Sequence, residues 1–182
     1  MISDHDRSGW FGASDVRYIM GNRKTKSFEN WWAVKLGLTS NNFTNTAMQA
    51  GTMYEHSILE FCNVPEMDKQ ILIPELLLRV NLDGNDDETD FEVKTYKYEK
   101  GFTVPKHYEQ QVNVQMFASK LKKGVILAYG LVEEDYRNFF RPIDKTRLSR
   151  HRVEYNGMWI EKEFLPKLKY YAELLKEGRW PL

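Results

Sequence analysis

The fold is decided by two short segments near the middle of the chain: Asn81-Leu82-Asp83-Gly84 and Asp90-Phe91-Glu92-Val93-Lys94. Both have the character of β-strands, in which successive side chains point to opposite faces of a sheet. Glu92 and Lys94 therefore project from one side of their strand, about 7 Å apart. Asp83 leaves its own strand on the side opposite to its apolar neighbours. We expect the two segments to pair as a hairpin.

Such a hairpin brings two carboxylates and an ammonium group together beside a half-buried sheet. Carboxylate oxygens suit Mg²⁺ or Mn²⁺, and a nearby lysine can orient or activate a water molecule. This is the chemistry of metal-assisted hydrolysis, for which phosphodiesters are the commonest substrates. A motif this short also occurs by chance, and a solvated polar face is the alternative. The acidic residues between and beside the segments are interpreted as a polar turn: Asp86, Asp87, Glu88 and Asp90.

Composition limits the classes of protein that the chain can belong to. Its 182 residues, 42% of them hydrophobic, suffice for one domain spanning residues 1–182. The single cysteine, Cys62, excludes an internal disulfide and a cysteine-based zinc site. Net charge is zero, with 26 basic and 26 acidic residues, which argues against a broad basic surface but not against a nuclease. With no signal peptide and no membrane-length apolar run, we expect a cytoplasmic protein without a membrane partner.

Hydrophobic spacing predicts alternating groups of helices and strands. Helices are expected at residues 14–20, 27–36, 46–62, 105–121 and 152–176, the last with a possible kink at Pro166. Strands are expected at 71–78, 80–83, 90–96, 125–132 and 138–143, with Pro74 as a break and the last two strands paired. This order of elements predicts a single α/β or α+β layered structure.

Glu55 falls at helical spacing with the apolar residues of the third predicted helix. A carboxylate in an apolar stripe is costly unless a cation or hydrogen bonds compensate it. Either Glu55 reaches solvent at the edge of the stripe, or it is a further metal ligand. Gly51, one turn earlier, would allow a close approach to the helix. The four histidines have no ligand-like spacing and receive no role: His5, His56, His107 and His151.

Two further groups of residues each have a structural and a functional interpretation. Gln111 and Gln115 share one face of the fourth predicted helix, which either is an exposed surface or contacts a phosphate or the attacking water. Near the start of the chain, Arg7 precedes Ser14, which is expected to cap the first helix. A capped helix N-terminus beside a guanidinium can bind an anion, and an ordinary cap with a surface arginine is the alternative.

Taken in order, five pieces of the sequence resemble a known family: Arg7 with Gly12-Ala13-Ser14-Asp15-Val16, Ala50-Gly51-Thr52-Met53-Tyr54-Glu55, Leu82-Asp83-Gly84, Phe91-Glu92-Val93-Lys94, and Gln110-Gln111-Val112-Asn113-Val114-Gln115. The family is that of phage lambda exonuclease, the YqaJ-type viral recombinase branch of the PD-(D/E)XK nuclease superfamily. The similarity continues as far as the strand ending near Gly130. It implies a central mixed β-sheet flanked by helices, with a restriction-endonuclease-like core.

The resemblance also implies a role for each residue that matches. Asp83 and Glu92, helped by the backbone carbonyl of Val93, would hold a catalytic Mg²⁺ or Mn²⁺. Lys94 would position the attacking water or stabilise the developing charge. Glu55 would complete the acidic cluster at a second metal ion.

At the edge of the implied site, Gln111 would lie beside the metal centre, and Arg7 and Ser14 would form a pocket for a 5′-terminal phosphate. The implied partners are double-stranded DNA, a single-strand annealing protein and further copies of the chain in a trimer. Leu82 replaces the proline that usually precedes the first aspartate. The chain is also shorter than lambda exonuclease, which affects the loops that build the trimer.

Together these features predict a metal-dependent deoxyribonuclease, a 5′→3′ exonuclease on linear duplex DNA that serves phage-type recombination. One alternative is an endonuclease of restriction or resolvase type on the same fold. The other is a noncatalytic member that binds DNA or a protein, which should have lost at least one of Asp83, Glu92 and Lys94.

Overall fold

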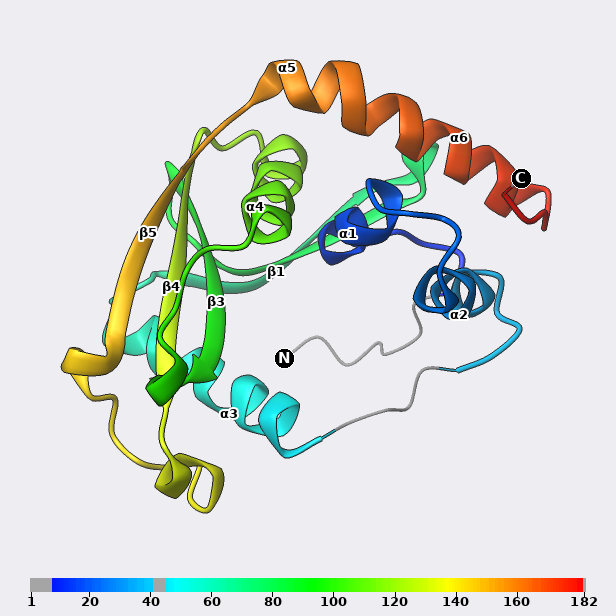
Figure 1. Cartoon of the computed structure of the whole chain (residues 1–182). Helices are drawn as coiled ribbons and strands as arrows, with labels where there is room; N and C mark the ends of the chain where they lie inside the picture. The colour runs from blue at the N-terminus through cyan, green and yellow to red at the C-terminus, as the bar shows by residue number, and fades with distance from the viewer. Residues whose placement is uncertain (1–7, 41–44, 182) are drawn as a thin grey trace.

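The computed structural model describes residues 8–40 and 45–181, and its centre is one mixed sheet with the strand order β1-β2-β3-β4-β5 (Figure 1). The strands are β1 (Glu66–Ile73), β2 (Leu78–Asn85), β3 (Thr89–Lys97), β4 (Lys123–Leu131) and β5 (Leu148–Glu154). β3 and β4 are parallel and are joined through a helix, whereas the other neighbours are antiparallel. The predicted mixed sheet flanked by helices is confirmed.

The α-helices are α1 (Val16–Ile19), α2 (Lys26–Lys35), α3 (Thr46–Phe61), α4 (Lys106–Ser119), α5 (Gly157–Trp159) and α6 (Leu165–Lys176). Side chains that precede α2 and α3 cap them, since Thr25 accepts from the N–H of Phe28 and Asn45 from that of Met48. α4 ends where Lys120 adopts a left-handed conformation, with φ of 65°. The glycine expected to stop this helix, Gly124, lies instead in β4.

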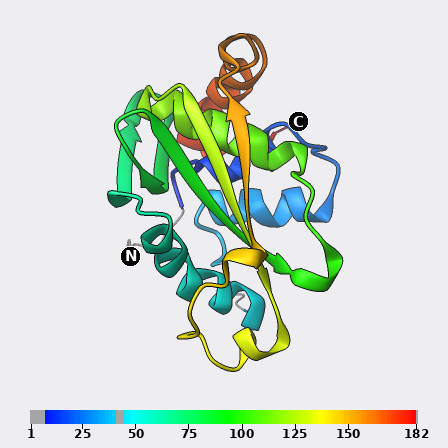
Figure 2. The same ribbon diagram turned by 90° about the vertical axis from the view of Figure 1, so that its left-hand side faces the viewer.

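Helices cover both faces of the central strands. Ile126 and Leu127 are neighbours in β4, so they point to opposite faces, and both are completely buried. Ile126 packs with Val112 and Met116 of α4, whereas Leu127 belongs to a separate core that includes residues of α3. The central strands therefore hold residues of α4 against one face and residues of α3 against the other. Figure 2 shows β3, β4 and β5 side by side, with the C-terminal helical run following β5.

A third core, rich in aromatic rings, joins the N-terminal segment to α2, α6 and the β1–β2 end of the sheet. Trp31 and Trp32 are buried there, and both pack against Tyr171. The buried Asp15 accepts a hydrogen bond from Trp31 Nε1 (2.7 Å) and pairs with the ammonium of Lys35 (2.6 Å). These contacts attach the segment before α1 to α2.

Two predicted elements near the C-terminus are wrong. Residues 138–143 form no strand, and the antiparallel partner of β4 is β5. The long helix predicted from Arg152 begins only at Gly157, after Asn156 caps it by accepting from the N–H of Trp159 (3.0 Å). The reason is that β5 lies at an edge of the sheet with largely solvated side chains, and its polar sequence resembles a helix surface.

Smaller differences concern breaks and ends. Pro74 does end a strand, but that strand is β1, which starts at Glu66 instead of Ile71. The helix predicted around Pro166 is interrupted by a π-helical turn, Ile160–Phe164, immediately before the proline. A proline lacks the N–H that continues a regular ladder, so a local change of pitch is expected there. Within the described ranges, no helix is long and apolar enough to cross a membrane.

Candidate active site

The predicted hairpin is present, and its two strands separate where the site lies. β2 and β3 pair only at Gly84 with Phe91 and at Asn85 with Asp90. Beyond these pairs, the Asp83 carboxylate takes the place of a backbone acceptor, since its Oδ2 accepts a hydrogen bond from the N–H of Val93 (2.8 Å). Asp83 therefore faces the Glu92–Lys94 segment, as the alternation of the two strands predicts.

Glu92 is the centre of the site. It is buried, with 3% of its surface exposed, and its Oε1 accepts from Lys94 Nζ (2.5 Å) and from Gln111 Nε2 (2.6 Å). Its Oε2 accepts from Gln115 Nε2 (2.5 Å). Three side-chain donors on β3 and α4 thus fix one carboxylate. Both glutamines are buried, so the exposed-surface interpretation is wrong.

Gln115 is a site residue to which the sequence assigned no definite role. Its spacing of four residues from Gln111 was the available signal, because such residues share one helix face. Whether that face pointed to solvent or to Glu92 depends on how α4 packs on β3, which no local pattern reveals. The glutamine side chain is almost completely buried, with 1% of its surface exposed.

Glu55 reaches the same region from α3, where it is half-buried. Burial raises the pKa of its carboxyl group, and so does the charge of Glu92, while Lys94 acts in the opposite direction. α3 approaches β3 closely at Gly51, because a Cβ at that position would lie 3.1 Å from Thr95 Oγ1. The close approach expected at Gly51 is therefore made by β3.

Charges in the site are strongly interdependent. Burial, Glu92 and Glu55 together hold the pKa of Asp83 well above its usual value, against the opposing effect of Lys94. Burial disfavours the ammonium of Lys94, but the charges of Glu92 and Asp83 outweigh it and raise the lysine pKa. A set of carboxylates that repel one another attracts a divalent cation, and oxygen ligands of this kind fit Mg²⁺ or Mn²⁺.

The sequence predicts Asp90 in a solvated turn, and this prediction is wrong. Asp90 is completely buried, and neither carboxyl oxygen has a hydrogen-bond partner among the described residues. Burial and the charge of Glu92 raise the pKa of Asp90 well above its usual value. The acid lies two residues before Glu92 on the same strand, so it shares the buried face of that residue.

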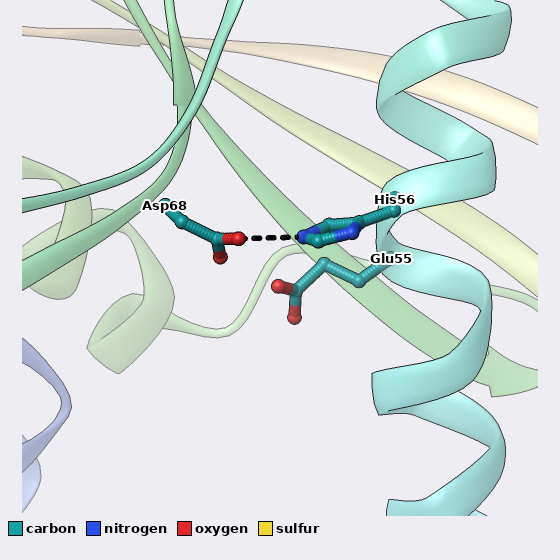
Figure 3. A group of neighbouring side chains, drawn as sticks. All are labelled: Glu55, His56 and Asp68. Atoms are coloured by element: carbon teal, nitrogen blue, oxygen red, sulfur yellow. Dashed lines mark ion pairs between the residues drawn. The ribbon is translucent and has the colours of Figure 1, made fainter. Parts of the chain in front are cut away.

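A second group of ligand-type side chains lies beside Glu55 (Figure 3). His56 Nε2 and Asp68 Oδ2 are 2.9 Å apart, and one ligand atom from each of Glu55, His56 and Asp68 lies within 4.8 Å of the other two. Among the described residues this is the only group of three that gathers so closely, and Asp83, Glu92 and Glu55 do not. The sequence reasoning gave His56 no role, since its partner Asp68 is twelve residues away in β1.

A groove of about 700 Å³ opens between the first turns of α3 and the end of β3. Glu55 and Lys94 lie in its wall, together with Gly51, Tyr96 and Tyr136. The wall of the groove thus combines charged side chains with aromatic rings.

The proposed anion site near the N-terminus has a different geometry from the one expected. Ser14 is exposed and lies inside a short 3-10 turn, Ala13–Asp15, whose N-cap position is Gly12. The expected cap at Ser14 is therefore wrong. Arg7 lies outside the described residues, so its pairing with Ser14 stays a prediction.

Comparisons with known proteins show where this fold occurs. No family model matches the sequence, and no curated protein matches it. Among solved structures, an alkaline exonuclease from Laribacter hongkongensis is 23% identical, with a TM-score of 0.65 over 94% of this chain and 93% of that one. The same enzyme in complex with dAMP has a TM-score of 0.70 at 20% identity, over 93% and 89% of the two chains.

A phage-related exonuclease from Haemophilus somnus 129PT is 14% identical, with a TM-score of 0.61 over 92% of this chain and 96% of that one. The chain therefore has the fold of these exonucleases along nearly its whole length. This agrees with the fold that the motif order implies.

Proposed function

We propose that the protein is a metal-dependent deoxyribonuclease that acts as a 5′→3′ exonuclease on linear duplex DNA. The observation that carries the proposal is the Glu92 carboxylate, fixed by Lys94, Gln111 and Gln115 directly opposite Asp83. A buried acid with this many donors is costly to maintain for stability alone. It makes sense as a ligand held in one orientation.

Asp83 and Glu92, with the carbonyl of Val93, would hold Mg²⁺ or Mn²⁺, and Glu55 would hold a second ion. A bound divalent cation supplies Lewis-acid polarisation of the phosphodiester and lowers the pKa of water. Lys94, whose raised pKa keeps it charged, would orient the attacking water and stabilise the charge that develops on phosphate. The reaction adds one water across a P–O bond and releases a nucleotide.

Structural neighbours support this reading, because both proteins in the comparison are exonucleases by name and one of the structures contains dAMP. A nucleotide of that size would fit the groove between α3 and β3. Recombination, an annealing-protein partner and a homotrimer rest on the motif resemblance.

The test is digestion of end-labelled duplex DNA with Mg²⁺ or Mn²⁺. We expect linear DNA with a 5′-phosphate to lose nucleotides progressively from that end, and covalently closed circles to survive. Cleavage of closed circles would indicate an endonuclease instead. Binding of DNA with no cleavage in either metal would indicate a noncatalytic member of the fold.

The pocket for the 5′-phosphate is tested in the same assay. We expect Arg7→Ala to remove the preference for a 5′-phosphate over a 5′-hydroxyl end, by about tenfold for one lost charge-assisted contact. Ser14→Ala should have a smaller effect in the same direction, because a neutral hydrogen bond is weaker. An unchanged preference in both variants would place the end-binding contacts elsewhere.

A further inference from the structure

The Glu55–His56–Asp68 group differs chemically from the centre at Asp83 and Glu92. It combines an imidazole nitrogen with two carboxylates, taken from α3 and β1. Mixed nitrogen and oxygen donors favour first-row transition metals over Mg²⁺, which prefers oxygen and retained water. The histidine is the decisive member, since an acidic cluster alone would carry no such preference.

The spacing within the group matches that of two ligands on one metal ion. Two ligand atoms about 2.1 Å from one metal ion and at right angles to each other are about 3 Å apart. His56 Nε2 and Asp68 Oδ2 are 2.9 Å apart. A metal ion can therefore bind both atoms with little movement of either side chain. Figure 3 shows Glu55 projecting from α3 beside this pair.

Electrostatics place Glu55 between two acidic neighbours. Its carboxylate is repelled by Glu92 of the central site and by Asp68 of the outer group. His56 and Lys94 compensate this charge only in part. The side chains of His56 and Asp68 are 41% and 26% exposed, so an ion can reach them from solvent.

We propose that Glu55, His56 and Asp68 form a separate site for a divalent transition-metal cation such as Mn²⁺, beside the Asp83–Glu92 centre. Glu55 lies next to both centres, so it links the outer cation to the inner one. The outer ion would neutralise the repulsion around Glu55 and fix the first turns of the groove wall. The inference does not require the chain to cleave DNA.

The experiment uses the full-length, EDTA-treated protein with Mn²⁺ alone and no DNA. Electron spin-echo spectroscopy of bound Mn²⁺ detects the strong ¹⁴N coupling of a directly coordinated imidazole, and calorimetry counts the ions. We expect ¹⁴N modulation in the wild type and in Asp83→Asn. We expect its loss in His56→Gln, and at least tenfold weaker binding of the ion at this site in Asp68→Asn.

His107→Gln is the matched control, since His107 lies outside the group and its replacement should leave the modulation unchanged. The half-exposed position of His56 makes His56→Gln tolerable for folding, and Asp68→Asn provides an independent readout through affinity. Absence of modulation in the wild type, or its persistence in His56→Gln, would overturn the proposal and leave His56–Asp68 as an ion pair. Intact DNA cleavage by Asp83→Asn would instead refute the proposed function and leave this site standing.

Discussion

At the scale of single residues, the chemistry depends on how Glu92 is held. Three side-chain donors converge on its two oxygens, and two of them come from α4. An ionised carboxylate presents four lone-pair positions, so these contacts leave room for a metal ion. The orientation of Glu92 is thus set before any ligand binds, which lowers the entropic cost of assembling the site.

Gln115 gives the first prediction at this scale. Gln115→Met keeps the volume but removes the donor to Glu92 Oε2, and one lost hydrogen bond to a buried charge costs about 1–3 kcal/mol. We expect DNA cleavage to fall about 10–100-fold, with a larger change in kcat than in KM. Gln110→Met, five residues earlier on the same helix, is the control and should cleave normally. Equal losses in both variants would mean that the effect is general destabilisation.

Asp83 gives a prediction about pH. Because its folded-state pKa is raised, the metal-free folded protein holds a proton that the unfolded chain releases. This stabilisation is complete below the unfolded-state pKa of about 3.9 and is lost as pH rises through the folded-state value. We expect the melting temperature of metal-free wild type to fall more steeply with rising pH than that of Asp83→Asn. Parallel curves would contradict the raised pKa.

Which site residues the sequence could predict follows from the range of the interactions. The alternation within β3 is local, so it correctly placed Glu92 with Lys94. The same alternation also put Asp90 on that buried face, and the acidic composition of its neighbours concealed this. Gln115 and His56 depend on how α4 and α3 pack, which no local pattern specifies. Their roles required the fold.

At the scale of elements, α3 is the helix whose placement sets Glu55. Tyr54, the preceding residue, is completely buried, and its hydroxyl donates to Asp135 Oδ1 (3.3 Å) and to the carbonyl of Asn138 (3.0 Å). Asp135 in turn pairs with Arg147 and with Arg141. This buried network ties α3 to the loop between β4 and β5.

Tyr54→Phe tests the network. Loss of the hydroxyl removes one hydrogen-bond donor from a carboxylate oxygen of Asp135. We therefore expect the free energy of unfolding to fall by about 1 kcal/mol. A modest fall in DNA cleavage should accompany it, because the next residue is Glu55. Chemical denaturation measures the first effect. Retained stability in Tyr54→Phe would show that the ring alone holds α3.

The same loop explains the strand that was predicted wrongly. Residues 138–143 are apolar enough to suggest a strand, but Arg141 turns back toward Asp135 (2.9 Å) instead of extending along β4. β5 has only one buried residue and several cationic side chains, so its strand period is weak in the sequence. Local patterns predicted β4 well because most of its residues are buried and apolar. Edge elements carry a weaker signal.

At the scale of the whole molecule, the sheet arranges two acidic centres beside one groove. The hairpin of β2 and β3 supplies Asp83 and Glu92, α4 supplies the glutamines, and α3 with β1 supplies the outer group. The fold shared with known exonucleases covers more than nine-tenths of the chain. We propose that this fold hydrolyses DNA by means of Asp83, Glu92 and Lys94.

The most direct test of that claim is the release of nucleotides from linear duplex DNA in Mg²⁺ by the wild type and by Lys94→Ala. Lys94 pairs with the buried Glu92 (2.5 Å), so we expect the metal-free variant to melt at a lower temperature than the wild type. Circular dichroism should show that it remains folded at the assay temperature. We expect its cleavage rate to fall by at least about 100-fold, the effect of removing one transition-state contact. A folded Lys94→Ala protein that cleaves DNA at the wild-type rate would contradict the account.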